Sequence, residues 1–364
     1  MTTPSIALKP TSTPVAADER AARMTEPGFG RIFTDNMVTI RYTEGRGWHD
    51  AELVPYGPLT LDPSTMALHY GQEIFEGLKA YRQPDGSIST FRADQNAQRF
   101  ANSARRLAMA ELPDQLFLDS VEALVTQDKD WVPTAVGESL YLRPTMIATE
   151  IGLGVRPSNE YLYFLIASVA GAYFPQGVKP VSIWLQTEYI RAAPGGTGEA
   201  KCAGNYAASL VAQRLAAKAG CDQVVWLDAV ERRFIEEMGG MNLCFVMADG
   251  TLVTPQLTGT LLPGVTRSAL LTLASELGLR TEERLVDVEE VTSGIVSGDI
   301  TEVFACGTAA VITPVGAVKS ADGIWIPGTG DSGEVTMQLR EALLEIQHGL
   351  RPDTHGWMKQ IVPA

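Results

Sequence analysis

A stretch near the middle of the chain, GAYFPQGVKP at residues 171–180, has the glycine and proline content of a linker and divides the 364 residues into two halves. Each half mixes strand-like and helix-like segments, and each contains a hairpin signal, Asp85-Gly86 in the first and Asp249-Gly250 in the second. Neither half shows the regular strand–helix alternation of a parallel sheet. The sequence therefore predicts an α+β protein, with a small N-terminal domain at 26–172, a linker at 173–181 and a large domain at 182–364.

The first 25 residues contain Pro and Thr but no apolar run of the kind that a signal peptide has, so we expect a flexible leader at 1–25. The uncharged stretch at 161–178 is broken by Gly and Pro in its second half, which favours a buried strand over a membrane span. Four scattered cysteines without a CxxC pair argue against a disulfide framework. We therefore expect a cytoplasmic protein without a membrane partner.

The charge balance argues against a polyanionic partner. Lys and Arg total 29 against 43 Asp and Glu, a net charge of −14, and no basic run interrupts this excess. Only four His accompany the four Cys, so we expect no metal site. A composition of 45% hydrophobic and 20% charged residues excludes a disordered chain. The function must therefore be sought in individual residues of a globular protein without a nucleic-acid partner.

Lys201 lies in the glycine-rich segment GGTGEAKCAGNY, directly before a predicted helix at 205–219. The segment is not a phosphate-binding P-loop, because Ala200 stands in place of the motif's Gly and Cys202 in place of its Ser or Thr. A solvated loop lysine is the ordinary interpretation. The alternative is a lysine in an apolar niche, where desolvation favours the neutral amine and allows it to form a Schiff base with an aldehyde.

Two adjacent carboxylates, Glu236 and Glu237, lie on the predicted strand FIEEM. Neighbouring residues of a strand point to opposite faces, so we expect only one of the two to face a buried site. Two solvated carboxylates at a sheet edge are the ordinary interpretation. In an apolar strand, however, a buried carboxylate needs a cationic partner, and a protonated pyridine nitrogen would be one.

Two further segments could bind anions. The segment Leu262–Arg267 enters a predicted helix with Thr266 as its N-cap, and backbone amides at a helix start suit a phosphate. The turn Gly307-Thr308-Ala309 between two predicted strands offers amides and a hydroxyl for a phosphate or a carboxylate. Each feature alone is weak, and Arg99 by itself is an ordinary surface arginine. Together with the amine of Lys201, the phenol of Tyr206 and the carboxyl group of Glu237, they match what pyridoxal phosphate (PLP) requires.

Nine segments, in the same order, resemble the branched-chain amino acid aminotransferases, PLP enzymes with the two-domain fold-type IV (D-amino acid aminotransferase-like) fold. The segments read FGRIFTDNM, LHYGQEIFEGLKAY, DKDWVP, LYLRP, KCAGNY, GCDQVVWL, EEMGGMN, LPGVTR and GTAAVITPV, and the similarity as a whole extends from about residue 29 to a predicted helix near the C-terminus. The resemblance implies reversible transfer of the amino group of L-leucine, L-isoleucine or L-valine to 2-oxoglutarate. It also implies a homodimer with shared active sites.

The resemblance also implies roles for single residues. It makes Lys201 the Schiff-base lysine and the group that moves a proton between substrate and cofactor. It makes Tyr206 the hydrogen-bond partner of the cofactor's phenolate oxygen, and Glu237 the carboxylate that keeps the ring nitrogen protonated. The implied phosphate ligands are Arg99, the amides of Val265 and Thr266, and Thr308.

The implied substrate-binding residues form two groups. Tyr70 and the Thr308-Ala309 turn resemble the family's α-carboxylate site, and Arg143 resembles the residue that accepts the second carboxylate of glutamate. The residues that resemble walls of the side-chain pocket are Phe29, Phe75, Tyr141 and Val155. In the family, the counterparts of Tyr70 and Val155 reach into the neighbouring subunit's site. Gly240 stands where some relatives have a threonine near the cofactor.

Several alternatives stay open at this stage. Within the same fold, D-amino acid aminotransferases and aminodeoxychorismate lyases are rivals. Outside catalysis, the rivals are a silent PLP-binding protein and a binding module without a cofactor. Finally, Ala310 and Thr313 stand where vertebrate relatives have a redox-active CxxC, so we expect no thiol switch there.

Overall fold

The chain forms two units, each with its own sheet, and the computed structural model describes residues 4–171 and 177–364. Within these residues, unit 1 comprises 4–171, 200–203 and 345–364, and unit 2 comprises 177–199 and 204–344. In the part of the chain that is described, no helix is long and apolar enough to cross a membrane.

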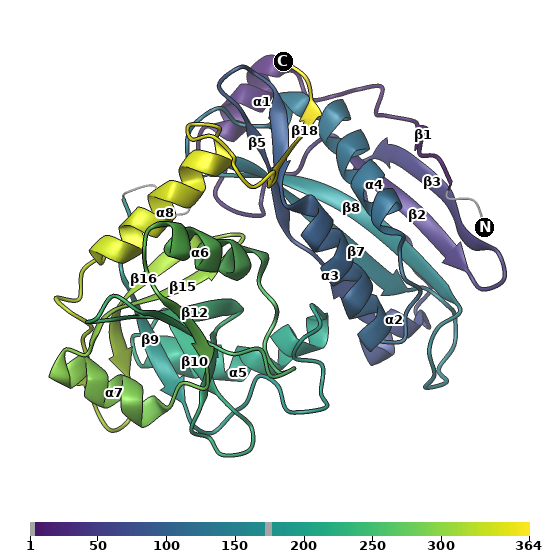
Figure 1. Cartoon of the computed structure of the whole chain (residues 1–364). Helices are drawn as coiled ribbons and strands as arrows, with labels where there is room; N and C mark the ends of the chain where they lie inside the picture. Colours follow the sequence, from purple (N-terminus) through teal and green to yellow (C-terminus); the bar gives the residue numbers. More distant parts are fainter. Residues whose placement is uncertain (1–3, 172–176) are drawn as a thin grey trace. The chain divides into compact units, whose positions relative to one another are not determined.

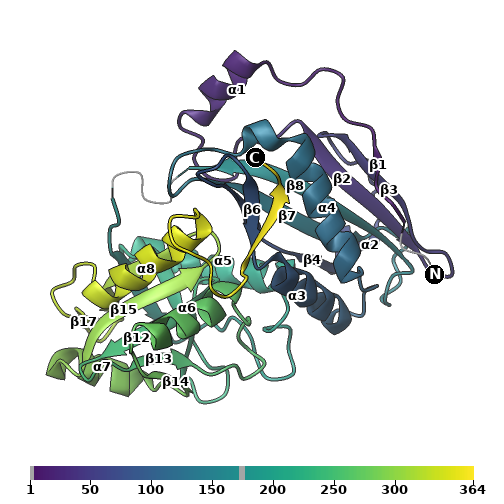
Figure 2. The ribbon, with the colours of Figure 1, turned by 45° about the horizontal axis from the view of Figure 1, so that its top comes forward.

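Unit 1 contains a nine-stranded sheet in the order β1-β3-β2-β8-β7-β5-β6-β18, with β4 paired to β7. Its strands are β1 (Ala7–Leu8), β2 (Asn36–Thr43), β3 (Gly47–Pro55), β4 (Glu73–Phe75), β5 (Leu78–Arg82), β6 (Ile88–Phe91), β7 (Ser139–Ala148), β8 (Glu160–Ala170) and β18 (Met358–Val362). Its helices are α1 (Ala17–Met24), α2 (Met66–Tyr70), α3 (Ala93–Arg106) and α4 (Asp114–Gln127), with a 3-10 turn at Lys129–Trp131. Helices α3 and α4 cover one face of this sheet (Figures 1 and 2).

The core of unit 1 lies between these two helices and the sheet. Phe100 of α3 packs against Phe117 of α4 and meets Tyr163 of β8 edge-on, with ring centroids 5.6 and 5.7 Å apart. The hydroxyl groups of Tyr163 and Ser120 are hydrogen-bonded at 2.8 Å, so the buried phenol keeps a polar partner. This packing fixes α3, which carries Asn96, Arg99 and Ser103 of the candidate site.

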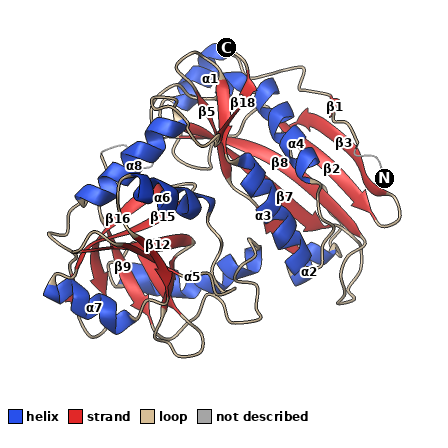
Figure 3. Cartoon of the chain, in the orientation of Figure 1, coloured by secondary structure: helices blue, strands red, loops and turns tan. Residues whose placement is uncertain are grey.

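Unit 2 contains a second nine-stranded sheet, in the order β11-β10-β9-β16-β15-β12-β13-β14, with β17 paired to β16. Its strands are β9 (Val181–Gln186), β10 (Gln223–Leu227), β11 (Ile235–Met238), β12 (Met241–Met247), β13 (Leu252–Pro255), β14 (Thr281–Arg284), β15 (Ile300–Gly307), β16 (Val311–Lys319) and β17 (Ile324–Trp325). The helices that follow residue 200 are α5 (Ala203–Lys218), α6 (Val265–Glu276), α7 (Val288–Ser297) and α8 (Glu334–Gln347), shown in blue in Figure 3.

An additional pairing between β11 and β12 closes six of these strands into a ring. Every strand of the ring contributes to one apolar cluster, which therefore fills its interior. On β10 the side chains alternate: Val225 and Leu227 join the interior cluster, whereas Val224 and Trp226 pack outward with Ala212 of α5. The outward packing holds α5, whose first turn carries Tyr206.

The α+β class is confirmed, but the expected leader at 1–25 is not a structureless segment. Strand β1 pairs in parallel with β3, the amide of Lys9 donates to the carbonyl of Leu53, and α1 follows. Sequence reasoning missed this structure because the segment's few apolar residues give no periodic pattern.

The expected domain boundaries also change. Residues 173–176 of the predicted linker, with residue 172 before them, lie outside the described part, and β9 already begins at Val181. Residues 200–203, including Lys201, and residues 345–364 belong to unit 1 instead of the large C-terminal domain. The physical reason is backbone pairing, because Cys202 bridges Ile74 and β18 pairs with β6.

Candidate active site

Unit 1 holds the backbone of Lys201 on both sides. The amide of Lys201 donates to the hydroxyl of Ser103 on α3 at 2.9 Å, and the amide of Phe75 on β4 donates to the carbonyl of Lys201 at 3.0 Å. The Nζ atom of Lys201 lies 5.1 Å from the centroid of the Phe75 ring. The predicted lysine is therefore fixed by a helix and a strand rather than left on a mobile loop.

Arg99 forms a buried ion pair with Glu76, beside Lys201. Its Nε and Nη2 atoms lie 2.6 and 2.9 Å from the two carboxylate oxygens, and Asn96 donates to the same carboxylate at 2.8 Å. Burial alone would raise the pKa of Glu76, but the charges of Arg99 and, more weakly, Lys201 hold that pKa below its usual value. Glu76 is a residue that sequence reasoning missed, because only the fold brings it to Arg99.

Three of the four predicted pocket walls form one aromatic cluster around Arg143. The rings of Phe29 and Tyr141 meet edge-on with centroids 4.9 Å apart, and the Cζ atom of Arg143 lies 4.8 Å from the centroid of Phe75. Arg143 also donates to the hydroxyl of Tyr141 at 3.2 Å. A Cβ atom at Gly77 would overlap this hydroxyl, so only glycine allows the tyrosine its position. Unit 1 thus combines apolar walls with a cation.

Tyr70 and Val155 do not join this cluster within unit 1. Tyr70 ends α2, is 41% exposed and donates its hydroxyl to the carbonyl of Leu153, whereas Val155 is 83% exposed. Leu68 and Ile151 are exposed beside them in the sequence. The two residues that the resemblance assigns to a neighbouring subunit's site are therefore both exposed.

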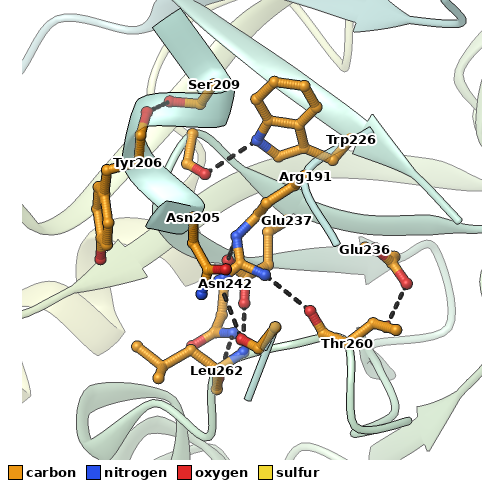
Figure 4. A network of polar contacts seen from close by, with 12 residues as sticks. Arg191, Asn205, Tyr206, Ser209, Trp226, Glu236, Glu237, Asn242, Thr260 and Leu262 are labelled. Atoms are coloured by element: carbon orange, nitrogen blue, oxygen red, sulfur yellow. Dashed lines mark hydrogen bonds and ion pairs between the residues drawn. The ribbon is translucent and has the colours of Figure 1, made fainter. Parts of the chain in front are cut away.

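In unit 2, Glu237 is 1% exposed and is held by a backbone amide and an arginine (Figure 4). The amide of Leu262 donates to its Oε1 atom at 2.6 Å, and the Nε atom of Arg191 lies 3.0 Å from its Oε2 atom. Arg191 also donates to the carbonyls of Thr260 and Gly198, at 2.7 and 3.2 Å. Sequence reasoning missed Arg191. The available signal was an arginine in an apolar context, YIRAAPGG, directly before the glycine-rich segment.

The second glutamate is buried as well, contrary to the expectation that only one of the two lies in a buried site. Glu236 accepts a hydrogen bond from the hydroxyl of Thr260. The expectation failed because both faces of β11 are buried, so all four of its residues are removed from water.

Tyr206 lies in the first turn of α5, next to Gly240. A Cβ atom at Gly240 would approach the Tyr206 ring to 3.2 Å, so the glycine leaves room for the phenol. The preceding residue, Asn205, accepts from the hydroxyl of Thr197 at 2.7 Å and donates to the carbonyl of Thr197 at 2.8 Å. These bonds tie the glycine-rich segment to the helix that carries Tyr206.

Helix α6 begins at Val265 with Gly264 as its N-cap, so the prediction of Thr266 as the cap is wrong. Thr266 is instead the second residue of the helix, and its amide, like that of Val265, belongs to the first turn, which has no carbonyl partner within the helix. Asn242 donates to the carbonyl of Leu262 at 3.1 Å and packs against Gly264. The start of α6 is therefore fixed close to the strand pair that carries Glu237.

The register of the sheet places the Thr308 turn at the same end. Glu237 is opposite Asn242, and Asn242 is opposite Cys306, two residues before Thr308. A Cβ atom at Gly307 would lie 3.3 Å from the side chain of Met241. Unit 2 therefore gathers its predicted residues at one end: Tyr206, Glu237, Gly240, Val265, Thr266, Thr308 and Ala309.

Comparison with known proteins identifies the family of this chain. Residues 73–318 match the family model described as Amino-transferase class IV. The sequence is 62% identical to a "Probable branched-chain-amino-acid aminotransferase" of Streptomyces coelicolor, over 98% of this chain and 99% of that protein. The chain belongs to the branched-chain amino acid aminotransferases.

Other relatives of this family give the same result. A branched-chain-amino-acid aminotransferase of Mycobacterium tuberculosis is 59% identical over 96% of each chain. The crystal structure of the Escherichia coli branched-chain amino acid aminotransferase superposes with a TM-score of 0.73 at 29% identity, over 88% of this chain and 99% of that one. The T.th. branched-chain amino acid aminotransferase, solved with pyridoxamine 5'-phosphate, gives a TM-score of 0.71 at 28% identity, over 88% and 98%. The predicted fold-type IV class and the PLP cofactor are confirmed.

The residues present fit that cofactor. An amine with a fixed backbone, a buried carboxylate, a phenol and the first amides of a helix are the groups that bind an aldehyde, a ring nitrogen, a phenolate and a phosphate. Among residues 4–171 and 177–364, no cluster of three or more His, Cys, Asp or Glu residues could hold a metal ion. The branched-chain aminotransferase thus carries, within its two units, every residue type that its cofactor needs.

Proposed function

We propose that this branched-chain aminotransferase transfers the amino group of L-leucine, L-isoleucine or L-valine to 2-oxoglutarate in two half-reactions, giving a 2-oxo acid and L-glutamate. PLP supplies the electron sink and carries the amino group between the half-reactions. The observation that carries the proposal is Lys201, held by Ser103 and Phe75 beside the aromatic cluster with Arg143. The confirmed family supports it.

Lys201 holds the cofactor covalently and moves the proton at the substrate's Cα atom. A general acid–base group must stay within hydrogen-bond reach of that proton, and a fixed backbone limits the positions that its amine can occupy. The hydrogen bonds that Lys201 donates to Ser103 and accepts from Phe75 provide this restraint.

Glu237 holds a proton on the cofactor's ring nitrogen, because a buried carboxylate stabilises a positive partner. The phenol of Tyr206 binds the phenolate oxygen. The phosphate is bound by Arg99, Thr308 and the amides of Val265 and Thr266, which adds the favourable end of the α6 dipole.

The aromatic cluster binds the substrate side chain. Apolar walls from Phe29, Phe75 and Tyr141 suit a branched aliphatic group, and Arg143 accepts the second carboxylate of glutamate. Such walls separate leucine, isoleucine and valine weakly, by roughly 1–3 kcal/mol per methylene. The α-carboxylate is bound by the Thr308-Ala309 turn and Tyr70.

We further propose a homodimer in which Tyr70 and Val155 complete the partner's site. Their exposure supports this, as does an apolar surface on α5 formed by Leu210, Val211 and Leu215, because exposed apolar groups of this size commonly mark interfaces. We also propose a cytoplasmic location. The four cysteines, all buried and none in a disulfide, support it.

The test of the reaction is an assay of L-leucine with 2-oxoglutarate, with D-alanine as the contrasting donor. Wild-type protein is expected to form L-glutamate from L-leucine only, and Lys201→Ala to lose turnover. Borohydride reduction followed by peptide mapping is expected to place the cofactor on Lys201. A cofactor found on another lysine, or turnover with D-alanine alone, would contradict the proposal.

A further inference from the structure

Arg191 lies among more buried negative groups than it can neutralise. Arg191, Glu236 and Glu237 are 8%, 5% and 1% exposed, so three ionisable side chains are removed from water at one place. Arg191 contacts Glu237 directly and reaches Glu236 through Thr260, whose carbonyl accepts from Arg191 and whose hydroxyl donates to Glu236 (Figure 4). One guanidinium thus stands between two carboxyl groups, and with both ionised the set carries one unbalanced negative charge.

Glu236 is held by a hydroxyl group, whereas Glu237 is held by a backbone amide and an arginine. The Oε1 atom of Glu236 accepts the Thr260 hydroxyl, but its Oε2 atom is buried without a hydrogen-bond partner among the described residues. Burial raises the pKa of Glu236, and the charge of Asp228 adds to this effect, while Thr260 and Arg191 only partly oppose it. Asp228 itself is held ionised by four backbone amides, those of Val230, Glu231, Arg233 and Phe234. Of Glu236 and Asp228, Glu236 is therefore the carboxyl group whose surroundings favour the protonated form.

A chain of two hydroxyl groups leads from Glu236 to the surface. The hydroxyls of Thr260 and Thr258 are hydrogen-bonded at 2.7 Å, and Thr258 is exposed. Both threonines and Glu236 line a cavity of about 260 Å3 that also contains Asp228 and Glu231. A proton can pass along such a chain of hydroxyls, each accepting one proton and donating another.

We propose that Glu236 exchanges a proton with water as the cofactor binds: it is protonated while Glu237 balances Arg191, and ionised once a positive ring nitrogen joins Glu237. In the protonated form the Glu236 O–H group donates to the Thr260 hydroxyl, and the Thr260 hydroxyl donates to Thr258. The Glu236 O–H bond then breaks: Thr260 accepts that proton and passes its own to Thr258, and Thr258 passes a proton to water. The Thr260 hydroxyl is left donating to the ionised Glu236 carboxylate. No electrons are transferred. The buried set is neutral in both states. Before binding, Arg191 is the cation and Glu237 the anion; after binding, the ring nitrogen adds a second cation and Glu236 a second anion.

This inference rests on the proposed role of Glu237 and concerns a positioning residue, since Glu236 acts through Thr260 and Arg191. It predicts that PLP affinity and pH are linked. Because binding releases a proton, affinity rises with pH over the range in which Glu236 titrates, by up to about tenfold per pH unit for one proton. In Glu236→Gln, the rise of PLP affinity with pH that is due to Glu236 should disappear.

The test titrates cofactor-free protein with PLP by calorimetry in two buffers of different ionisation enthalpy, from about pH 5 to about pH 8. We expect wild type to release one more proton than Glu236→Gln, and to gain up to about tenfold more affinity per pH unit. Glu231→Gln is the matched control, because Glu231 lines the same cavity but is exposed, and it should behave like wild type. Equal proton release by wild type and Glu236→Gln would overturn the inference.

A second measurement uses the wild-type protein alone, so it does not depend on the folding of a variant. The infrared difference spectrum between cofactor-free and loaded protein should show the loss of one protonated-carboxyl stretch. Thr260→Val should release the proton more slowly in stopped-flow with a pH indicator, and Thr260→Ser should restore the rate. An unchanged carboxyl stretch would contradict the inference.

Glu237→Gln separates this inference from the function on which it depends. If that variant binds PLP with the affinity and absorption spectrum of wild type, the role proposed for Glu237 is wrong. If Glu237→Gln changes both but Glu236→Gln leaves proton release intact, only the inference about Glu236 is wrong.

Discussion

Each unit contains a buried ion pair between an arginine and a glutamate, and the two pairs are built differently. In unit 1, Arg99 contacts both oxygens of Glu76, and an asparagine and a backbone amide add to the carboxylate's partners. In unit 2, Arg191 directs Nε to Glu237 and donates its other groups to two carbonyls. A pair with matched partners stabilises the fold, whereas a pair whose arginine is divided among several acceptors leaves its carboxylate able to stabilise a further cation.

The largest effect is expected for the Arg191–Glu237 pair of unit 2. Glu237→Gln should lower kcat for L-leucine by about 10²–10³-fold, because the cofactor's ring nitrogen loses the charge that stabilises its proton. Steady-state kinetics with L-leucine and 2-oxoglutarate measure this loss. Thermal unfolding of the cofactor-free variant should change less than that of Glu76→Gln, because Arg191 keeps two carbonyl acceptors and Glu236 can balance its charge. A fall in stability as large as that of Glu76→Gln would erase the distinction between the pairs.

The Arg99–Glu76 pair of unit 1 should respond in the opposite way, with a large loss of stability. Glu76→Gln leaves the guanidinium of Arg99 buried without its counter-charge, so we expect a loss of about 3–5 kcal/mol in the free energy of unfolding. Urea unfolding of cofactor-free protein measures it. The matched control is Glu111→Gln, which removes the partner of Arg105 in an exposed ion pair and should be indistinguishable from wild type.

The same pair makes a pH-dependent contribution. Arg99 and Lys201 hold the pKa of Glu76 below its usual value, so the stabilisation is fully present above the pKa of an unfolded glutamate and is lost as the pH falls through the folded value. The difference in unfolding free energy between wild type and Glu76→Gln should therefore shrink on acidification. A difference that grows towards acid would show that Glu76 is not held ionised.

A smaller effect on activity is expected at Gly240, which follows the strand that carries Glu237. Gly240→Ala brings a methyl group to 3.2 Å from the Tyr206 ring, so a phenol that binds the cofactor must shift, and we expect about a tenfold loss of kcat/KM. Gly204→Ala, in the same helix as Tyr206 but facing open space, is the control. Equal kinetics for the two variants would contradict a close fit at Gly240.

The sequence predicted those parts of the site that depend on local pattern. Lys201 follows a glycine-rich segment, Glu237 lies on an apolar strand, and the Thr308 turn joins two strands, as expected. What it could not predict are pairings between distant segments. Glu76 and Arg99, or Arg191 and Glu237, meet only after the strands have paired. For the same reason, the attachment of residues 200–203 and 345–364 to unit 1 was missed.

Strand β18 has a consequence for how this protein is made. It occupies the edge of the unit 1 sheet beside β6, although some 270 residues separate the two strands. A chain emerging from the ribosome therefore presents β6 as an open edge until residues 358–362 have been synthesised. The sheet of unit 1 is translated first, but it is completed only when the end of the chain has been made. Loss of the C-terminal residues would therefore leave the N-terminal unit without an edge strand of its sheet.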